Sequence, residues 1–134
     1  MFFLFASSFF IKKVRESYAV KMVTCMIRPE QLNEVTSALA EQNLMMGMTV
    51  MEVRGFGRQR GDRDKHSGRD DQAIRYLPKL KLEILVPFKQ AERLIEVIVQ
   101  TLRTGEIGDG KIVVYEAAHL MRVRTGEKGQ YALH

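Results

Sequence analysis

The order of the expected elements constrains this fold more than any other feature of the chain. Apolar runs and alternating patterns indicate strands at 22–28, 48–56, 79–87 and 111–116. Helical spacing of apolar residues indicates helices at 30–42 and 88–103, each directly after a proline. Two right-handed strand–helix–strand halves make one antiparallel sheet with both helices on the same face. We therefore expect an α+β, ferredoxin-like βαββαβ sandwich.

The first expected strand is apolar on both sides. Met22 and Met26 alternate with Val23 and Ile27, so neither face of the strand is suited to water. Helices cover only one face of a ferredoxin-like sheet, and the second face then needs another protein surface. We expect other copies of this chain to supply that surface, which predicts an oligomer.

Composition sets broad limits on function. The chain has 134 residues, 46% hydrophobic and 28% charged, which suits one globular domain. Its net charge of +5 is compatible with nucleic acid, nucleotides or other small anions as ligands. The one cysteine, Cys25, excludes an internal disulfide, and its apolar surroundings favour a core position over a nucleophile. Because the sequence supports no Ser-His-Asp or Cys-His constellation, we expect a protein that is not an enzyme.

Residues 1–21 stand apart from this pattern. The apolar run before Lys12 and Lys13 is too short for a membrane-spanning helix, and its charges follow the run, unlike those of a secretory signal. A weak anchor to a membrane or partner, a docking arm, and an extension upstream of a start at Met22 all fit. We favour the extension, because the folded pattern begins there, and expect no stable membrane insertion.

A glycine-rich segment, Gly-Glu-Ile-Gly-Asp-Gly-Lys at 105–111, precedes the last expected strand. Glycines let backbone N–H groups approach an anion, and the lysine adds a positive charge. The letters fit the start of a P-loop, but Ile112 stands where that motif has Ser or Thr, and a strand follows instead of a helix. The segment is either a phosphate-binding loop of another fold or a turn that needs no ligand.

Six segments, in this order along the chain, together resemble the PII nitrogen-regulatory signal-transduction family. They are IRPEQLNEV (27–35), ALAEQ (38–42), GMTVMEVRGFGRQRG (47–61), LPKLKLEI (77–84), RTGEIGDGKIVVYE (103–116) and RVRTGEKG (122–129). The resemblance implies a homotrimer of ferredoxin-like subunits with three clefts between neighbours. It also implies that ATP and ADP compete for each cleft and that 2-oxoglutarate joins ATP and Mg²⁺ there. The single cysteine suits a reducing compartment, and we expect a cytoplasmic protein.

The resemblance also implies where the ligands bind. It places a domain at 22–130, with a T-loop at 57–76, a B-loop at 104–111 and a C-loop at 122–129, and leaves 131–134 as a tail. The implied nucleotide-binding residues are Thr49, Gly55, Phe56, Gly57, Arg58, Glu83, Gly108, Asp109, Gly110, Lys111, Arg122 and Arg124. Of these, Arg122 and Arg124 reach the phosphates from the neighbouring subunit. The implied 2-oxoglutarate residues are Gln59, Arg60 and Lys79, and Gln59 also gives an oxygen ligand to Mg²⁺.

The T-loop is where this chain departs from the family. His66 stands about where many members carry a tyrosine that accepts a nucleotidyl group, so that modification is in doubt here. Ser67 is a weak candidate for phosphorylation. The loop is polar and densely charged, and we expect it to become ordered on a target protein such as an ammonium channel, another transporter or a metabolic enzyme.

Two alternative functions remain open. One is a PII-like nucleotide sensor that no longer binds 2-oxoglutarate and serves a transporter or enzyme outside nitrogen metabolism. The other is a nucleic-acid-binding module, because ferredoxin-like sheets bind RNA through aromatic residues on their central strands. The expected central strands carry Cys25, Ile27, Leu82 and Ile84 instead, which disfavours nucleic acid.

Overall fold

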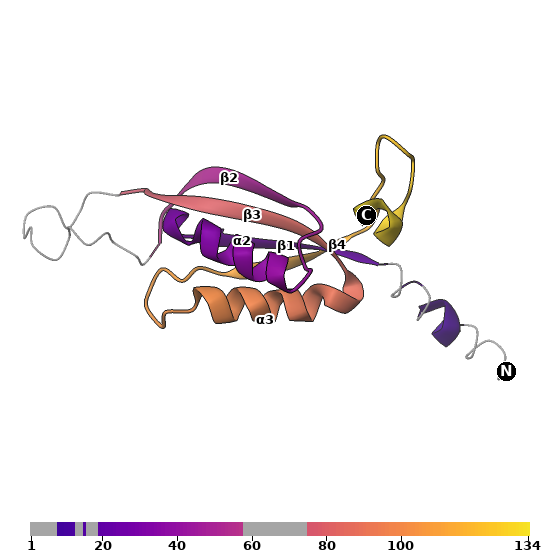
Figure 1. Cartoon of the computed structure of the whole chain (residues 1–134), viewed down its shortest axis with the longest axis horizontal. Coiled ribbons are helices and arrows are strands. Elements are labelled where there is room, and N and C mark those ends of the chain that lie inside the picture. The colour runs from indigo at the N-terminus through magenta and orange to yellow at the C-terminus, as the bar shows by residue number, and fades with distance from the viewer. Residues whose placement is uncertain (1–7, 13–14, 16–18, 58–74) are drawn as a thin grey trace, which may run out of the picture.

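The structure, a computed structural model, describes residues 8–12, 15, 19–57 and 75–134. The strands are β1 (Val20–Ile27), β2 (Met48–Gly55), β3 (Leu77–Pro87) and β4 (Ile112–Ala117). The helices that pack on the sheet are α2 (Leu32–Glu41) and α3 (Ala91–Leu102), with 3₁₀ turns η1 (Pro29–Gln31), η3 (Phe88–Gln90) and η4 (Gly129–Leu133). Residues 8–12, ahead of the sheet, are also helical. The strands form one sheet in the order β2-β3-β1-β4, and α2 and α3 lie side by side against it (Figure 1). This arrangement confirms the expected α+β, ferredoxin-like sandwich.

Two central strands organise the core. β1 pairs antiparallel with both β3 and β4, and β3 pairs antiparallel with β2. Cys25 of β1 faces Leu82 of β3, and Val23 faces Ile84, so paired positions place their side chains on the face that the helices cover. These side chains join one cluster with residues of both helices, namely Val35, Leu39, Leu94, Val97, Ile98 and Leu102. Burial raises the pKa of the Cys25 thiol to about 11, which agrees with a core residue and not with a nucleophile.

The sheet begins earlier than the sequence indicated. Val20 and Lys21 belong to β1, and Val20 is 2% exposed because it lies between Pro87 of β3 and Ala117 of β4. The backbone N–H of Phe88 donates to the carbonyl of Ala19 at 2.9 Å, which extends the contact by one more residue. The expected boundary at 22 is therefore two residues late. Burial of Val20 against two strands is a tertiary contact that local patterning does not report.

The second face of the sheet is mixed. Met26 is 40% exposed and Tyr115 56% exposed on that face, while Lys81 and Glu83 of β3 form an ion pair at 3.0 Å there. A face that combines exposed apolar side chains with an ion pair is suited to contact with other protein subunits. Among the residues that the structure describes, no helix has the length and hydrophobicity to cross a bilayer.

Leu82 and Val50 are direct neighbours across β2 and β3, yet Leu82 is fully buried and Val50 is 40% exposed. We predict that Leu82→Ala lowers the free energy of unfolding by about 2–5 kcal/mol, because it leaves a cavity in the core. Val50→Ala, the matched control, costs less than about 1 kcal/mol. Chemical denaturation at one fixed protein concentration measures both. Equal losses would contradict the burial of Leu82, because Val50 lies on the same face of the sheet but at an exposed position.

Candidate functional site

The B-loop lies at one end of the sheet, beside the end of β2 and the start of β3. A cavity of about 250 Å³ opens between them. Its lining residues are Met26, Val53, Arg54, Gly55, Phe56, Gly57, Leu77, Lys79, Gly108 and Gly110. The fold thus brings together three groups of predicted site residues that are far apart in sequence: Gly55 to Gly57, Lys79, and the glycines of the B-loop.

The carboxylate of Asp109 organises the B-loop. It accepts hydrogen bonds from the backbone N–H groups of Thr104 and Gly105, both at 2.9 Å, and from the Thr104 hydroxyl. Nη1 of Arg28 adds an ion pair at 3.2 Å. These donors, the Thr104 hydroxyl first, hold the pKa of Asp109 far below its ordinary value, so the group is ionised at physiological pH. Its oxygens serve the loop itself, and only the backbone of Asp109 is suited to an anionic ligand.

Gly110 seats the B-loop on the end of β1. It has φ of 84°, and a Cβ atom at this position would overlap the carbonyl oxygen of Met26. Gly105 has a similar φ of 83°, but open space surrounds it. Glycine at 110 is therefore required twice, by the left-handed backbone and by the close approach of two chain segments.

Lys79 stands at the start of β3, on the cavity wall. Partial removal from water lowers the pKa of Lys79, the charge of Arg28 lowers it further, and Glu30 acts in the opposite direction. A bound anion would favour the charged form of Lys79 and offset its repulsion with Arg28, since it supplies the opposite charge to both cations. The position suits capture of an anionic group in the cavity.

Two aromatic rings meet where the chain enters and leaves the T-loop, and one of them, Phe56, lines the cavity. The rings of Phe56 and Tyr76 lie 6.0 Å apart between centroids and are inclined by 54°. Phe56 is 65% exposed and is one of the predicted nucleotide-binding residues. Tyr76 is not among the predicted site residues. Its place before the LPK segment gave no signal in the sequence, because the pairing is made only when β2 and β3 align.

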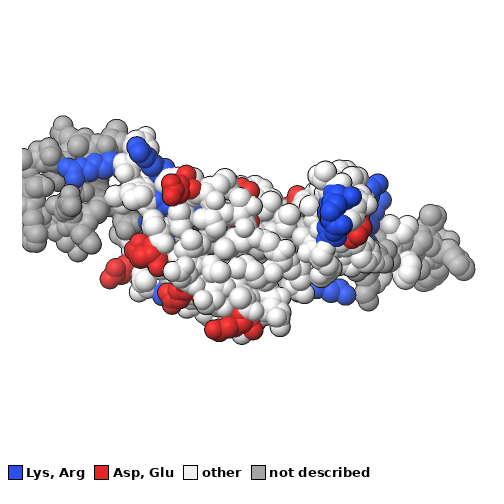
Figure 2. All heavy atoms as spheres, turned by 45° about the horizontal axis from the view of Figure 1, so that its top comes forward, with Lys and Arg blue, Asp and Glu red and all other residues white. Residues whose placement is uncertain are grey.

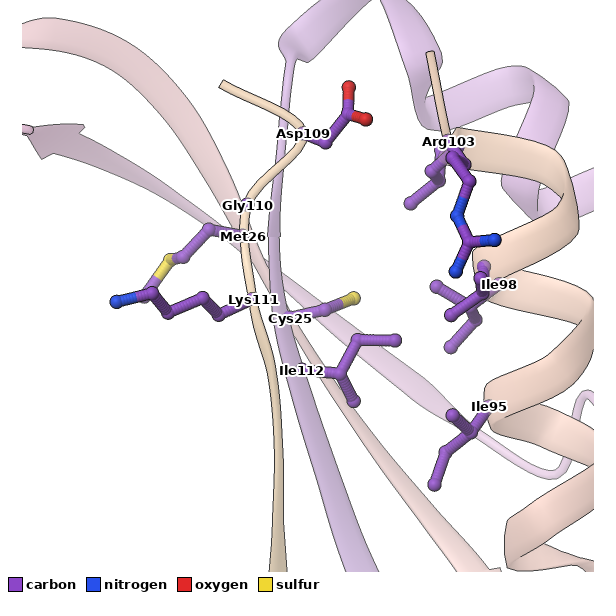
Figure 3. A pocket seen from close by; sticks show the side chains of 11 residues that line it. Cys25, Met26, Ile95, Ile98, Arg103, Asp109, Gly110, Lys111 and Ile112 are labelled. Carbon is purple, nitrogen blue, oxygen red and sulfur yellow. The ribbon is translucent and has the colours of Figure 1, made fainter. Parts of the chain in front are cut away.

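A second cavity, of about 280 Å³, lies between α3 and the B-loop. Figure 3 shows Cys25, Ile112, Ile95 and Ile98 turned toward one another across it, so its walls there are apolar. Lys111 instead extends beside Met26, on the other side of the chain from Cys25 (Figure 3). Met26 lines both cavities, and Lys111 is a lining residue of the second. The Lys111 side chain therefore lies beside Met26, at the end of the sheet where both cavities open.

Four predicted nucleotide-binding residues lie away from the B-loop. Thr49 and Glu83 pair with each other across β2 and β3, and six residue steps separate Thr49 from Gly55, about 20 Å along a strand. The C-loop, with Arg122 and Arg124, lies at the opposite end of the sheet from the B-loop (Figure 1). A single subunit therefore does not bring the two parts of the predicted nucleotide site together.

The C-loop is ordered by its own contacts. Arg122 pairs with Glu127 at 3.3 Å and donates to the Ala132 carbonyl at 3.1 Å, and the N–H of Gly126 donates to the Arg122 carbonyl at 2.8 Å. Figure 2 shows Lys and Arg side chains gathered on the C-terminal segment. Five of the predicted ligand and modification positions lie outside the described residues. They are Arg58, Gln59, Arg60, His66 and Ser67.

Arg28 is the site residue that sequence reasoning missed. Its side chain is 15% exposed, pairs with Asp109, and donates from Nη2 to the carbonyl of Ile107 at 3.3 Å. A basic residue between a strand and a helix-opening proline carries no distinctive pattern, so only the fold reveals this contact.

Comparison with known proteins identifies relatives along most of the chain. The family model described as "Nitrogen regulatory protein P-II" matches residues 20–127. The Nitrogen regulatory protein P-II of Haemophilus influenzae is 42% identical over 114 residues, 85% of this chain and 100% of the relative. Nitrogen regulatory protein P-II 1 of Escherichia coli K12 gives the same values. Among solved structures, Arabidopsis thaliana PII bound to citrate superposes with a TM-score of 0.68 at 38% identity, covering 85% of this chain and 92% of that one.

The two B-loop glycines offer a matched test of how the loop is seated. We predict that Gly110→Ala lowers the melting temperature more than Gly105→Ala, because both pay about 1–2 kcal/mol for a left-handed backbone but only the first also collides with Met26. Differential scanning calorimetry of the two variants measures the contrast. If the two melting temperatures fell equally, the close approach of the B-loop to β1 would be wrong.

Proposed function

The chain belongs to the nitrogen regulatory protein P-II family, and we propose that it binds ATP or ADP, together with 2-oxoglutarate, in clefts between subunits. Members of this family are signalling regulators that act on other proteins. The observation that carries the proposal is the cavity where Gly55 to Gly57 and Lys79 meet the B-loop. Backbone N–H groups of a glycine-rich loop, beside two lysines, are suited to the phosphates of a nucleotide.

The placement of the remaining site residues supports an assembly with cyclic symmetry. The B-loop and the C-loop lie at opposite ends of the sheet, about 23 Å apart along the seven residue steps of β1. A nucleotide that contacts both must therefore take them from two different subunits. Head-to-tail contacts close into a ring when the rotation between subunits allows it, and the trimer implied by the family is such a ring. The mixed second face of the sheet would be covered in that assembly.

The proposed second ligand is 2-oxoglutarate, bound beside the nucleotide. Lys79 supplies a partly desolvated cation in the cavity, and Gln59 and Arg60 follow directly from its Gly57 edge. The similar Arabidopsis protein is known with citrate bound, so a carboxylate ligand is compatible with a member of this family. ATP and ADP carry several negative charges, and a dicarboxylate next to them requires neutralisation.

Magnesium would provide that neutralisation. Among the described residues, no three His, Cys, Asp or Glu side chains gather into a metal site. The fitting donors for Mg²⁺ are oxygens, so ATP phosphates, 2-oxoglutarate and the Gln59 amide would hold it. We accordingly propose that 2-oxoglutarate binds with ATP and Mg²⁺ and that ADP does not support it.

The output of this sensor is a target protein. We propose that the T-loop, which joins β2 to β3 directly at the cavity, changes conformation with the bound ligand and docks on an ammonium channel, another transporter or a metabolic enzyme in the cytoplasm. Ligands shift such an equilibrium only through contacts that differ between its states. Phe56 and Lys79, at the two roots of the loop, are placed to make those contacts. The strands β1 and β3 contain no aromatic residue, which disfavours an RNA-binding sheet.

Calorimetry distinguishes these proposals. We predict that the wild-type protein binds ATP and ADP, and that 2-oxoglutarate releases heat only with ATP and Mg²⁺ present. Binding of nucleotide without any response to 2-oxoglutarate would instead favour the sensor that has lost its second ligand. Absence of binding to either nucleotide at millimolar concentration would contradict the proposed function, and binding of single-stranded RNA would favour the nucleic-acid alternative.

A mixing experiment tests whether neighbouring subunits share each site. We predict that Arg122→Gln with Arg124→Gln, and separately Lys111→Gln, weaken ATP binding at least about tenfold, because each change removes a charge-assisted contact to phosphate. Mixed oligomers refolded from the two variants contain some clefts in which both halves are wild-type, so tight binding returns to a fraction of sites. If refolded mixtures bind no better than the separate variants, the two halves belong to one subunit.

A further inference from the structure

Arg28 connects segments that are far apart in the chain. It follows β1, and its two terminal nitrogens both reach the B-loop, one to the carboxylate of Asp109 at 3.2 Å and one to the carbonyl of Ile107 at 3.3 Å. A planar guanidinium that holds two acceptors fixes their relative positions as well as their distance. The B-loop is thereby held at two points, 79 and 81 positions from Arg28.

The base of Arg28 is also fixed. Its backbone N–H donates to the Gln31 side chain at 3.3 Å, and the Gln31 N–H donates back to the Arg28 carbonyl at 3.0 Å. The side-chain amide nitrogen of Gln31, Nε2, donates in turn to the backbone carbonyl of Leu102, the last residue of α3, at 3.4 Å. The hydrogen bonds therefore close a ring. They run from the end of α3 through Gln31 and Arg28 to Asp109, which is bonded to Thr104 and Gly105 just after α3.

The charge balance of the loop depends on the same pair. Asp109 places a negative charge inside a loop proposed to bind phosphates, which by itself would repel them. Arg28 neutralises that charge, and the side chains of the pair are 15% and 25% exposed, so water screens it only partly. Loss of Arg28 would both release the loop and leave the carboxylate unpaired beside the ligand.

We propose that Arg28 is a positioning residue for the B-loop: its bridge from Asp109 to Ile107 holds the loop in the shape that receives the nucleotide phosphates. The proposal rests on nucleotide binding as the proposed function. A loop that is ordered before the ligand arrives loses less conformational entropy on binding. The guanidinium contributes through the loop and not as a phosphate ligand, which separates its role from that of Arg122 and Arg124.

A double-mutant cycle tests this role. Arg28→Gln and Asp109→Asn are each expected to weaken ADP binding about tenfold, measured by calorimetry without 2-oxoglutarate. The double variant is expected to be no weaker than the weaker single variant, because both changes break one bridge. Arg28→Lys, which keeps the charge but not the fork, is expected to recover part of the affinity.

The matched control is Arg93→Gln. Arg93 also forms an ion pair, to Glu96 at 3.1 Å, and donates to the Gln42 side chain at 3.0 Å, but on the outer surface of the helices. This variant is expected to bind ADP like the wild type. The positioning role would be overturned if the double variant lost as much ADP binding free energy as the two single variants together. Wild-type ADP affinity in Arg28→Gln would also overturn it.

Amide hydrogen exchange in the absence of nucleotide gives a second readout that does not depend on binding. Residues 104–110 are expected to exchange faster in Arg28→Gln than in the wild type and in Arg93→Gln, because the ring that closes the loop is open. Unchanged exchange would overturn the proposal even if ADP binds as expected. If Arg28→Gln exchanges faster than the wild type but the wild type binds no nucleotide, Arg28 still holds the B-loop, and only the proposed function is contradicted.

Discussion

Burial of one face of β1 and β3 is the constraint on which this structure depends. Val23 and Cys25 lie opposite Ile84 and Leu82 beneath the helices, and a register shift of one residue would turn this set of side chains away from the core. The fixed register also fixes where each strand ends. The end of β1, the end of β2 and the start of β3 consequently meet at one edge, and the chain leaving α3 must pass there.

The loop at that end of the sheet is held by local contacts. Gly110 lets the B-loop lie directly on the Met26 carbonyl, and Asp109 gathers donors from Thr104, Gly105 and Arg28. An acidic residue is unexpected in a loop proposed to bind phosphates. The hydrogen bonds of its carboxylate all go to groups of the loop and to Arg28, so the carboxylate holds the loop, and in the proposed site the backbone and the lysines would contact the anion.

The proposed nucleotide site depends on assembly as much as on the fold of one subunit. The B-loop and the C-loop lie at opposite ends of one subunit, each ordered by contacts of its own. In the proposed assembly, neither loop would need to become ordered before it meets its counterpart on a neighbour, which would keep the entropic cost of forming the cleft low. Gly57 begins the T-loop and Leu77 follows its end, and both line the same cavity, so the proposed ligand would lie next to both ends of the loop.

The sequence by itself determined the order of strands and helices, the buried face of β3, and the glycine-rich loop, because periodicity and glycine spacing are local properties. The family motifs added Gly55 to Gly57 and Lys79, which the fold does bring to that loop. Only the tertiary structure decided that Val20 belongs to the sheet, that Gly110 must clear Met26, and that Arg28 holds Asp109. Each of these joins segments that are distant along the chain, and a one-dimensional pattern records which residues are buried but not which of them meet.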